Sequence, residues 1–133
     1  MLTPTKIQVR FADIDAMGHV NNAVYFSYFE TARINYFKQI LGDDWDWQID
    51  GVLLVRNEID YILPISLHDS PEITIEIENI GAKSFTLCYK VFVKNKLMTA
   101  AKSVLVSYDN VNGQTKLVPE KMKQKLIKHL LRG

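Results

Sequence analysis

Apolar side chains recur with helical spacing between Ala23 and about Leu41, the longest regular pattern in the chain. One helix face is outlined by positions i, i+4, i+7, i+11 and i+15, which are Tyr25, Phe29, Ala32, Tyr36 and Ile40. Further apolar residues occupy most of the remaining circumference, which predicts a helix that is buried nearly all round. Asn21 or Asn22 is expected to cap its start, and Gly42 its end.

Alternation of apolar and polar residues predicts the strands. In residues 72–80, Ile73, Ile75 and Ile77 share one face, while threonine and glutamate side chains occupy the other. The same kind of pattern predicts a short strand at 6–11 and long strands at 52–61, 72–80, 84–94 and 97–108. A lysine-rich amphipathic helix is expected at about 119–132.

The predicted order of elements favours an α+β fold. The connections between the long strands leave no room for parallel crossovers, so the sheet is expected to be antiparallel. Such a sheet must cover an apolar face, and the long helix is the element available to fill it. We therefore expect an antiparallel sheet wrapped around one long central helix. A chain of 133 residues has room for one domain, and residues 1–133 are expected to form it.

Composition and charge exclude several classes of protein. With 47% apolar and 23% charged residues, the chain is unlike disordered, collagen-like or membrane proteins. The net charge of +1 lacks the basic excess that is usual for nucleic-acid-binding proteins. The single cysteine, Cys88, excludes an intrachain disulfide and a cysteine-rich zinc site, and the histidines lack metal-ligand spacing. Because no targeting or membrane-spanning segment is recognised, we expect a cytoplasmic protein.

The segment before the long helix, residues 12–22, concentrates polar side chains: two aspartates, a glycine, a histidine and two asparagines. The start of a buried helix offers unpaired N–H groups and the positive end of the helix dipole, which can polarise a carbonyl group. Asp15 is close enough in sequence to present a carboxylate to the same pocket, a combination that suits ester or thioester hydrolysis. Turn formation and helix capping account for the same residues, because Asp and Asn are common in both roles.

A longer motif in this region points to a known family. Between Val9 and Tyr25 the sequence contains D-x-D-x-x-G-H-V-N-N-x-x-Y, which resembles the signature of hot-dog-fold acyl-CoA thioesterases of the 4-hydroxybenzoyl-CoA thioesterase-like family. Residues 28–33, 59–61 and 81–85 agree with the resemblance, which covers residues 5–108. It implies the hot-dog fold, an antiparallel sheet wrapped around one long helix.

The resemblance also implies which residues form the site. Asp15 corresponds to the catalytic carboxylate, acting either as the general base that deprotonates water or as the nucleophile that attacks the carbonyl. Backbone N–H groups near Asn21, Asn22 and Ala23 correspond to those that polarise the carbonyl. The region that approaches coenzyme A contains Lys83 and Ser84. The expected substrate-binding residues are Gly18, His19, Val20, Asn21, Asn22, Ala23, Tyr25, Lys83 and Ser84, with no metal ion.

Several of these residues have a simpler explanation as well. His19 is a candidate for contacting substrate or handling a proton, and the alternative is a loop histidine bonded to the backbone. Tyr25 is a candidate pocket wall or an ordinary core residue. Glu30 offers a rival catalytic carboxylate, but Arg33 follows one helical turn later, so an ion pair between them is expected. Lys83 is either a phosphate contact or a solvated turn residue.

The resulting hypothesis is an acyl-CoA thioesterase that releases a carboxylic acid and coenzyme A. Coenzyme A is then part of the substrate, and no cofactor is expected. Because the family builds its site between two subunits, the resemblance implies a homodimer or homotetramer. Two alternatives remain: a thioesterase acting on acyl-carrier protein, and a non-catalytic acyl-binding module in which Asp15 only caps a turn.

Overall fold

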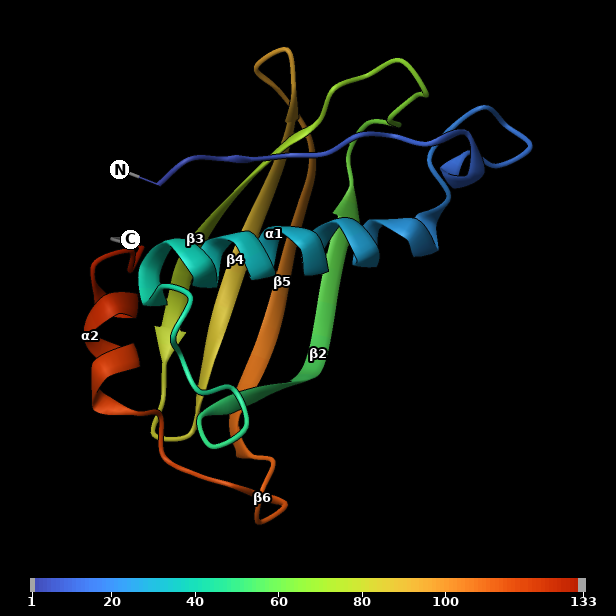
Figure 1. Cartoon of the computed structure of the whole chain (residues 1–133). Coiled ribbons are helices and arrows are strands. Elements are labelled where there is room, and N and C mark those ends of the chain that lie inside the picture. The colour runs from blue at the N-terminus through green and yellow to red at the C-terminus, as the bar shows by residue number, and fades with distance from the viewer. Residues whose placement is uncertain (1, 132–133) are drawn as a thin grey trace. The chain divides into compact units, whose positions relative to one another are not determined.

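The long helix predicted from the sequence is present, and four long strands follow it along the chain (Figure 1). The computed structural model describes residues 2–131. Its elements, in chain order, are β1 (Thr5–Lys6), η1 (Phe11–Asp13), η2 (Asn22–Val24), α1 (Tyr25–Leu41), β2 (Gly51–Tyr61), β3 (Glu72–Ile80), β4 (Ser84–Val93), β5 (Lys96–Asp109), β6 (Gln114–Thr115) and α2 (Glu120–Ile127). The strands form one sheet in the order β1-β3-β4-β5-β2, and β6 pairs with β5.

The chain divides into two compact units, and α1 packs on the sheet in each of them. The first unit contains residues 2–36, 59–75 and 89–101, and the second contains 37–58, 76–88 and 102–131. In the first unit, the ring of Phe29 on α1 stacks on Tyr89 of β4 at 4.5 Å. In the second unit, Phe37 on α1 meets Phe85 of β4 edge-on at 6.2 Å. The expected α+β fold, with a long helix against an antiparallel sheet, is confirmed.

The predicted core face of α1 is buried, but the rest of the helix is not. Tyr25, Phe29, Ala32, Tyr36 and Ile40 are each at most 9% exposed. Phe26 is 40% exposed and Ile34 is 63% exposed. The expectation of a helix buried nearly all round is therefore wrong for the single chain, because only one side of α1 packs on the sheet.

The first strand is shorter than predicted. Pairing between β1 and β3 is limited to Thr5 with Ile73 and Lys6 with Glu72. One further hydrogen bond runs from the Ile7 N–H to the carbonyl oxygen of Pro71, at 2.9 Å. Proline has no N–H to donate in return, so regular pairing ends there. The strand expected at 6–11 is therefore only two residues long, and the chain reaches η1 in an irregular extended form.

The C-terminal helix ends at Ile127, because the chain beyond it pairs with a strand. Ile77 of β3 donates its N–H to the His129 carbonyl at 2.9 Å, and the Leu131 N–H donates to the Ile77 carbonyl at 2.6 Å. These bonds direct the tail along β3, and they involve residues 129 and 131, which the helix prediction had included. The predicted end of the helix, residue 132, lies outside the described residues.

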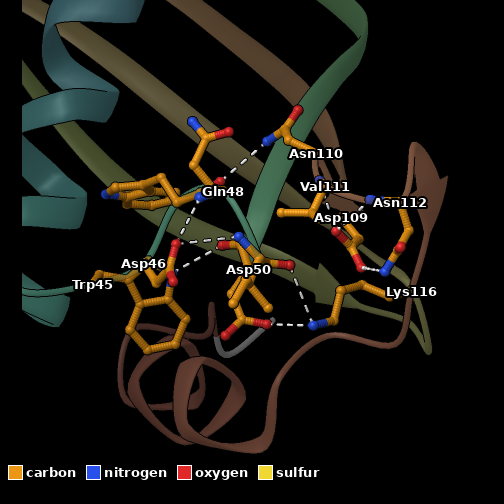
Figure 2. Close-up of polar contacts among 11 residues, drawn as sticks. Trp45, Asp46, Gln48, Asp50, Asp109, Asn110, Val111, Asn112 and Lys116 are labelled. Carbon is orange, nitrogen blue, oxygen red and sulfur yellow. Dashed lines mark hydrogen bonds and ion pairs between the residues drawn. The ribbon is translucent and has the colours of Figure 1, made fainter.

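A polar junction connects the loop after α1 to the turn between β5 and β6 (Figure 2). The Asn110 side-chain amide donates to the Trp47 carbonyl at 3.1 Å, and its backbone N–H donates to the Gln48 carbonyl at 2.8 Å. The Lys116 ammonium forms an ion pair with Asp50. The loop is therefore held by side chains about 60 residues away in sequence.

Candidate active site

The polar segment before α1 forms a tight hairpin. The Asp15 N–H donates to the His19 carbonyl at 2.8 Å, and the Gly18 N–H donates to the Asp15 carbonyl at 3.0 Å. Ile14 and Val20 form an antiparallel bridge just outside this pair. Gly18 has a φ of +82°, a left-handed conformation that glycine adopts without steric cost. The hairpin therefore brings Asp15 and His19 opposite each other.

Asp15 uses one carboxylate oxygen to stabilise this turn. Its Oδ1 accepts the backbone N–H of Met17 at 2.9 Å and that of His19 at 3.3 Å. The Oδ2 atom has no hydrogen-bond partner among residues 2–131. The turn thus orients the carboxylate and leaves one oxygen available.

A cleft of about 230 Å³ opens beside this carboxylate. The hairpin and the start of α1 form one part of its wall, and the end of β2 with the residues after it forms the other. The lining residues are Asp15, Met17, His19, Val20, Asn22, Tyr25, Tyr61, Ile62, Leu63 and Pro64. Of the predicted site residues, the structure therefore brings Asp15, His19, Val20, Asn22 and Tyr25 together.

Backbone N–H groups at the helix start differ in their availability. The Asn21 N–H donates to the Asp13 carbonyl at 2.8 Å. The Ala23 N–H donates to the side-chain oxygen of Asn21 at 2.9 Å, so Asn21 is the capping residue. For the Asn22 N–H, no acceptor is found within the described residues. Of the three N–H groups expected to polarise a carbonyl, Asn22 alone remains free to do so.

Two tyrosines close one side of the cleft. The Tyr61 ring meets the Tyr25 ring edge-on at 5.0 Å, and its hydroxyl donates to the Asn22 carbonyl at 3.0 Å. Burial raises the pKa of the Tyr25 hydroxyl, which therefore stays protonated at neutral pH. Sequence reasoning assigned no role to Tyr61, because the contact joins residues 36 positions apart in the chain. Its only signal was membership of the matching segment 59–61.

The remaining predicted residues lie elsewhere or act structurally. Lys83 is exposed and Ser84 is half-buried at the start of β4, in the second unit, and neither lines the cleft. No ion pair joins Glu30 to Arg33 in residues 2–131, so that expectation is wrong. Arg33 instead donates to the Tyr89 hydroxyl at 3.1 Å.

Metal ligands do not gather in the part of the chain that the structure describes. Within residues 2–131, no group of three His, Cys, Asp or Glu side chains is placed to hold a metal ion. Of the described helices, none is long and apolar enough to cross a membrane.

Sequence and structure comparisons relate the chain to known proteins. Residues 9–126 match the sequence model of the thioesterase-like superfamily. The chain belongs to this superfamily. It is 33% identical to a solved thioesterase from Thermus thermophilus, complexed with coenzyme A and Zn. The two structures superpose with a TM-score of 0.82, over 92% of this chain and 95% of the other. The hot-dog fold implied by the motif is confirmed.

Curated relatives of this superfamily member match smaller shares of the chain. It is 27% identical over 104 residues to the long-chain acyl-CoA thioesterase FadM of Escherichia coli K12. That match covers 76% of this chain and 77% of FadM. It is 33% identical over 84 residues to the uncharacterized protein YsmA of Bacillus subtilis 168. That match spans 63% of this chain and only 56% of YsmA.

Proposed function

We propose that the protein is an acyl-CoA thioesterase in which Asp15 activates the attack on the acyl carbonyl. The oxygen of water bonds to the carbonyl carbon, the carbon–sulfur bond breaks, and the products are a carboxylic acid and coenzyme A. One observation carries the proposal: Asp15 lines a cleft with one oxygen held by backbone amides and the other unpaired within residues 2–131.

The fixed carboxylate of Asp15 can act in two ways. As a general base, Asp15 takes a proton from the attacking water and releases it to solvent after the carbon–sulfur bond has broken. As a nucleophile, it displaces the thiolate to form a mixed anhydride, which water then hydrolyses. In either case the leaving thiolate, whose conjugate acid has a pKa of about 8.5, departs without a strong general acid and is protonated by solvent.

Other groups around the cleft are assigned supporting roles. The Asn22 N–H, at the positive end of α1, donates to the thioester carbonyl as negative charge develops on its oxygen. Val20 and Tyr25 line the space for the acyl group, together with Tyr61. His19 contacts the substrate from the hairpin, and Gly18 supports the turn without lining the cleft.

The proposal is tested by following thiol release from a panel of acyl-CoA substrates. Asp15→Asn is expected to lower kcat by about 10²–10⁴-fold, the usual contribution of a positioned base. An asparagine oxygen still accepts the Met17 and His19 amides, so the turn should survive. Asp46→Asn is the matched control, because Asp46 accepts the Gln48 and Ile49 amides in a similar turn.

The panel has three informative outcomes. Thiol release that is lost in Asp15→Asn and kept in Asp46→Asn supports the proposal. Undiminished turnover by Asp15→Asn removes Asp15 from the reaction. A wild-type protein that releases no thiol from any acyl-CoA is not an acyl-CoA thioesterase.

Two other functions are each favoured by one observation. The lysines of α2 and its end, Lys121, Lys123, Lys125 and Lys128, suit an acidic carrier protein as the thiol donor. Presenting the same acyl group on coenzyme A and on carrier protein separates these substrates. The turn made by Asp15 suits an acyl-binding module, which would bind acyl-CoA in calorimetry without releasing thiol.

The proposal includes assembly into a homodimer or homotetramer. The outermost strand, β2, exposes Leu53 (41%), Leu54 (43%) and Val55 (56%) in the single chain. A row of exposed apolar residues on an edge strand is a ready pairing surface, and a second copy of the chain is the proposed partner. In this assembly Lys83 and Ser84 are proposed to contact the coenzyme A portion of the substrate.

The remaining parts of the proposal concern organisation and location. Residues 1–133 are proposed to work as one thioesterase domain. A cytoplasmic location is proposed because the single cysteine, Cys88, fits a reducing compartment.

A further inference from the structure

Asp13, two residues before Asp15, is the only buried carboxylate in the part of the chain that the structure describes. It is 1% exposed. Its Oδ2 accepts the Tyr28 hydroxyl at 2.6 Å and the Arg10 backbone N–H at 2.9 Å. Its Oδ1 accepts the Arg10 guanidinium at 3.1 Å. Nothing in the proposed reaction uses this group, so its position needs another explanation.

The backbone of Asp13 closes the hairpin that carries Asp15. The Asp13 carbonyl accepts the Asn21 N–H at 2.8 Å, and the Asp13 N–H donates to the Arg10 carbonyl at 2.9 Å. The bridge between Ile14 and Val20 lies directly inside this closure. The two ends of the hairpin are therefore joined at Asp13.

Tyr28 is the residue of α1 that bonds to the Asp13 side chain. The Arg10 side chain is 73% exposed, so its ion pair with Asp13 is weakened by solvent. Tyr28 is only 7% exposed, and its hydroxyl makes the shortest bond to the carboxylate. Burial alone would raise the pKa of Asp13, but the hydrogen bonds from Tyr28 and Arg10 outweigh it and hold the pKa below its ordinary value. The carboxylate thus remains an ionised acceptor at neutral pH.

We propose that Asp13 and Tyr28 form a clamp that holds the hairpin on α1 and so positions Asp15 in the cleft. They are positioning residues, because neither lines the cleft beside Asp15. The inference rests on the proposed function for its effect on catalysis. Its structural part, that the Tyr28 hydroxyl orders the Met17 and His19 amides around Asp15, stands apart from any activity.

Tyr28→Phe tests the clamp, and Tyr36→Phe is its matched control. Both variants delete one hydroxyl from a buried tyrosine on α1, and the two positions lie about 12 Å apart along the helix axis. If the clamp positions Asp15, Tyr28→Phe lowers kcat by about 10–100-fold, as a displacement near 1 Å would do, with KM within about twofold. Tyr36→Phe keeps the wild-type kcat. An equal fall in kcat in both variants would indicate general loosening of the helix and overturn the clamp.

A second readout does not depend on activity. Amide hydrogen exchange at Met17 and His19 is expected to speed up in Tyr28→Phe and to stay at the wild-type rate in Tyr36→Phe. Unchanged exchange in Tyr28→Phe overturns the clamp, whether or not the wild-type protein hydrolyses acyl-CoA. Faster exchange together with an inactive wild-type protein keeps the clamp and rejects the proposed function.

Discussion

Replacing Gly51 with alanine is expected to destabilise the protein. Backbone conformation alone would give the opposite result. Gly51 begins β2 with an ordinary negative φ, which alanine adopts readily, and alanine lowers the entropy of the unfolded chain, a stabilisation of about 0.4–1 kcal/mol. Steric crowding around an added Cβ reverses the sign of the expected change in stability. A Cβ at Gly51 would lie 2.5 Å from the Trp47 carbonyl oxygen and 2.6 Å from the Asn110 side-chain nitrogen. These two atoms form the hydrogen bond between the Asn110 side chain and the Trp47 carbonyl in the polar junction.

The size of the destabilisation depends on how far the atoms around Gly51 have to move. Real Cβ contacts essentially never fall below 3.0 Å, so the junction has to open by at least 0.5 Å around Gly51. Overpacking of this kind costs about 1–3 kcal/mol. Loss of the Asn110–Trp47 hydrogen bond costs about a further 1 kcal/mol. These costs exceed the entropic gain, so a net loss of about 1–3.5 kcal/mol is expected.

Urea denaturation of the two glycine variants Gly51→Ala and Gly81→Ala measures this effect. At Gly81 the nearest atom to an added Cβ is the Ser84 hydroxyl oxygen at 3.4 Å, an ordinary contact. Gly81→Ala should therefore keep or slightly raise the free energy of unfolding. If Gly51→Ala proves as stable as Gly81→Ala, the junction is softer than the structure implies and the steric argument fails.

Two further predictions concern acid stability and assembly. Because the folded-state pKa of Asp13 lies below its ordinary value of 3.8, its stabilisation is fully present above pH 3.8 and is lost as the pH falls through the lower folded value. Asp13→Asn should therefore flatten the dependence of unfolding free energy on pH in this acidic range, and an unchanged slope in urea titrations would contradict the assignment. Leu54→Lys should shift the oligomer towards monomer in sedimentation velocity; a wild-type protein that is already monomeric would reject the β2 interface.

Local sequence patterns predicted the helices and strands that bury one face against the core. The strand predicted at residues 72–80 has the same bounds as β3, because alternation records directly which side meets the core. The core face of α1 was likewise readable from its periodicity, since Phe29 and Tyr36 recur on the side that packs. The polar composition of residues 12–22 indicated a turn and a helix cap, and Asn21 provides that cap.

Features set by distant residues were not readable in this way. The length of β1 depends on Pro71, which pairs with Ile7 and has no N–H to continue the ladder. The end of α2 depends on Ile77, whose backbone groups bond to the tail. Tyr61 reaches the cleft because the sheet carries it to Tyr25, a contact that no local pattern records.

The two interpretations of Asp15 are compatible, because a carboxylate has two oxygens. Turn formation by aspartate is common in this chain: Asp46 and Asp109 each accept backbone amides two and three residues ahead. Such a turn needs a single acceptor, which an asparagine would supply equally well. Asp15 also lines a cleft with its second oxygen unpaired in residues 2–131, and the turn does not require that feature. The negative charge is therefore the property to test, and an asparagine at this position removes the charge while keeping the turn.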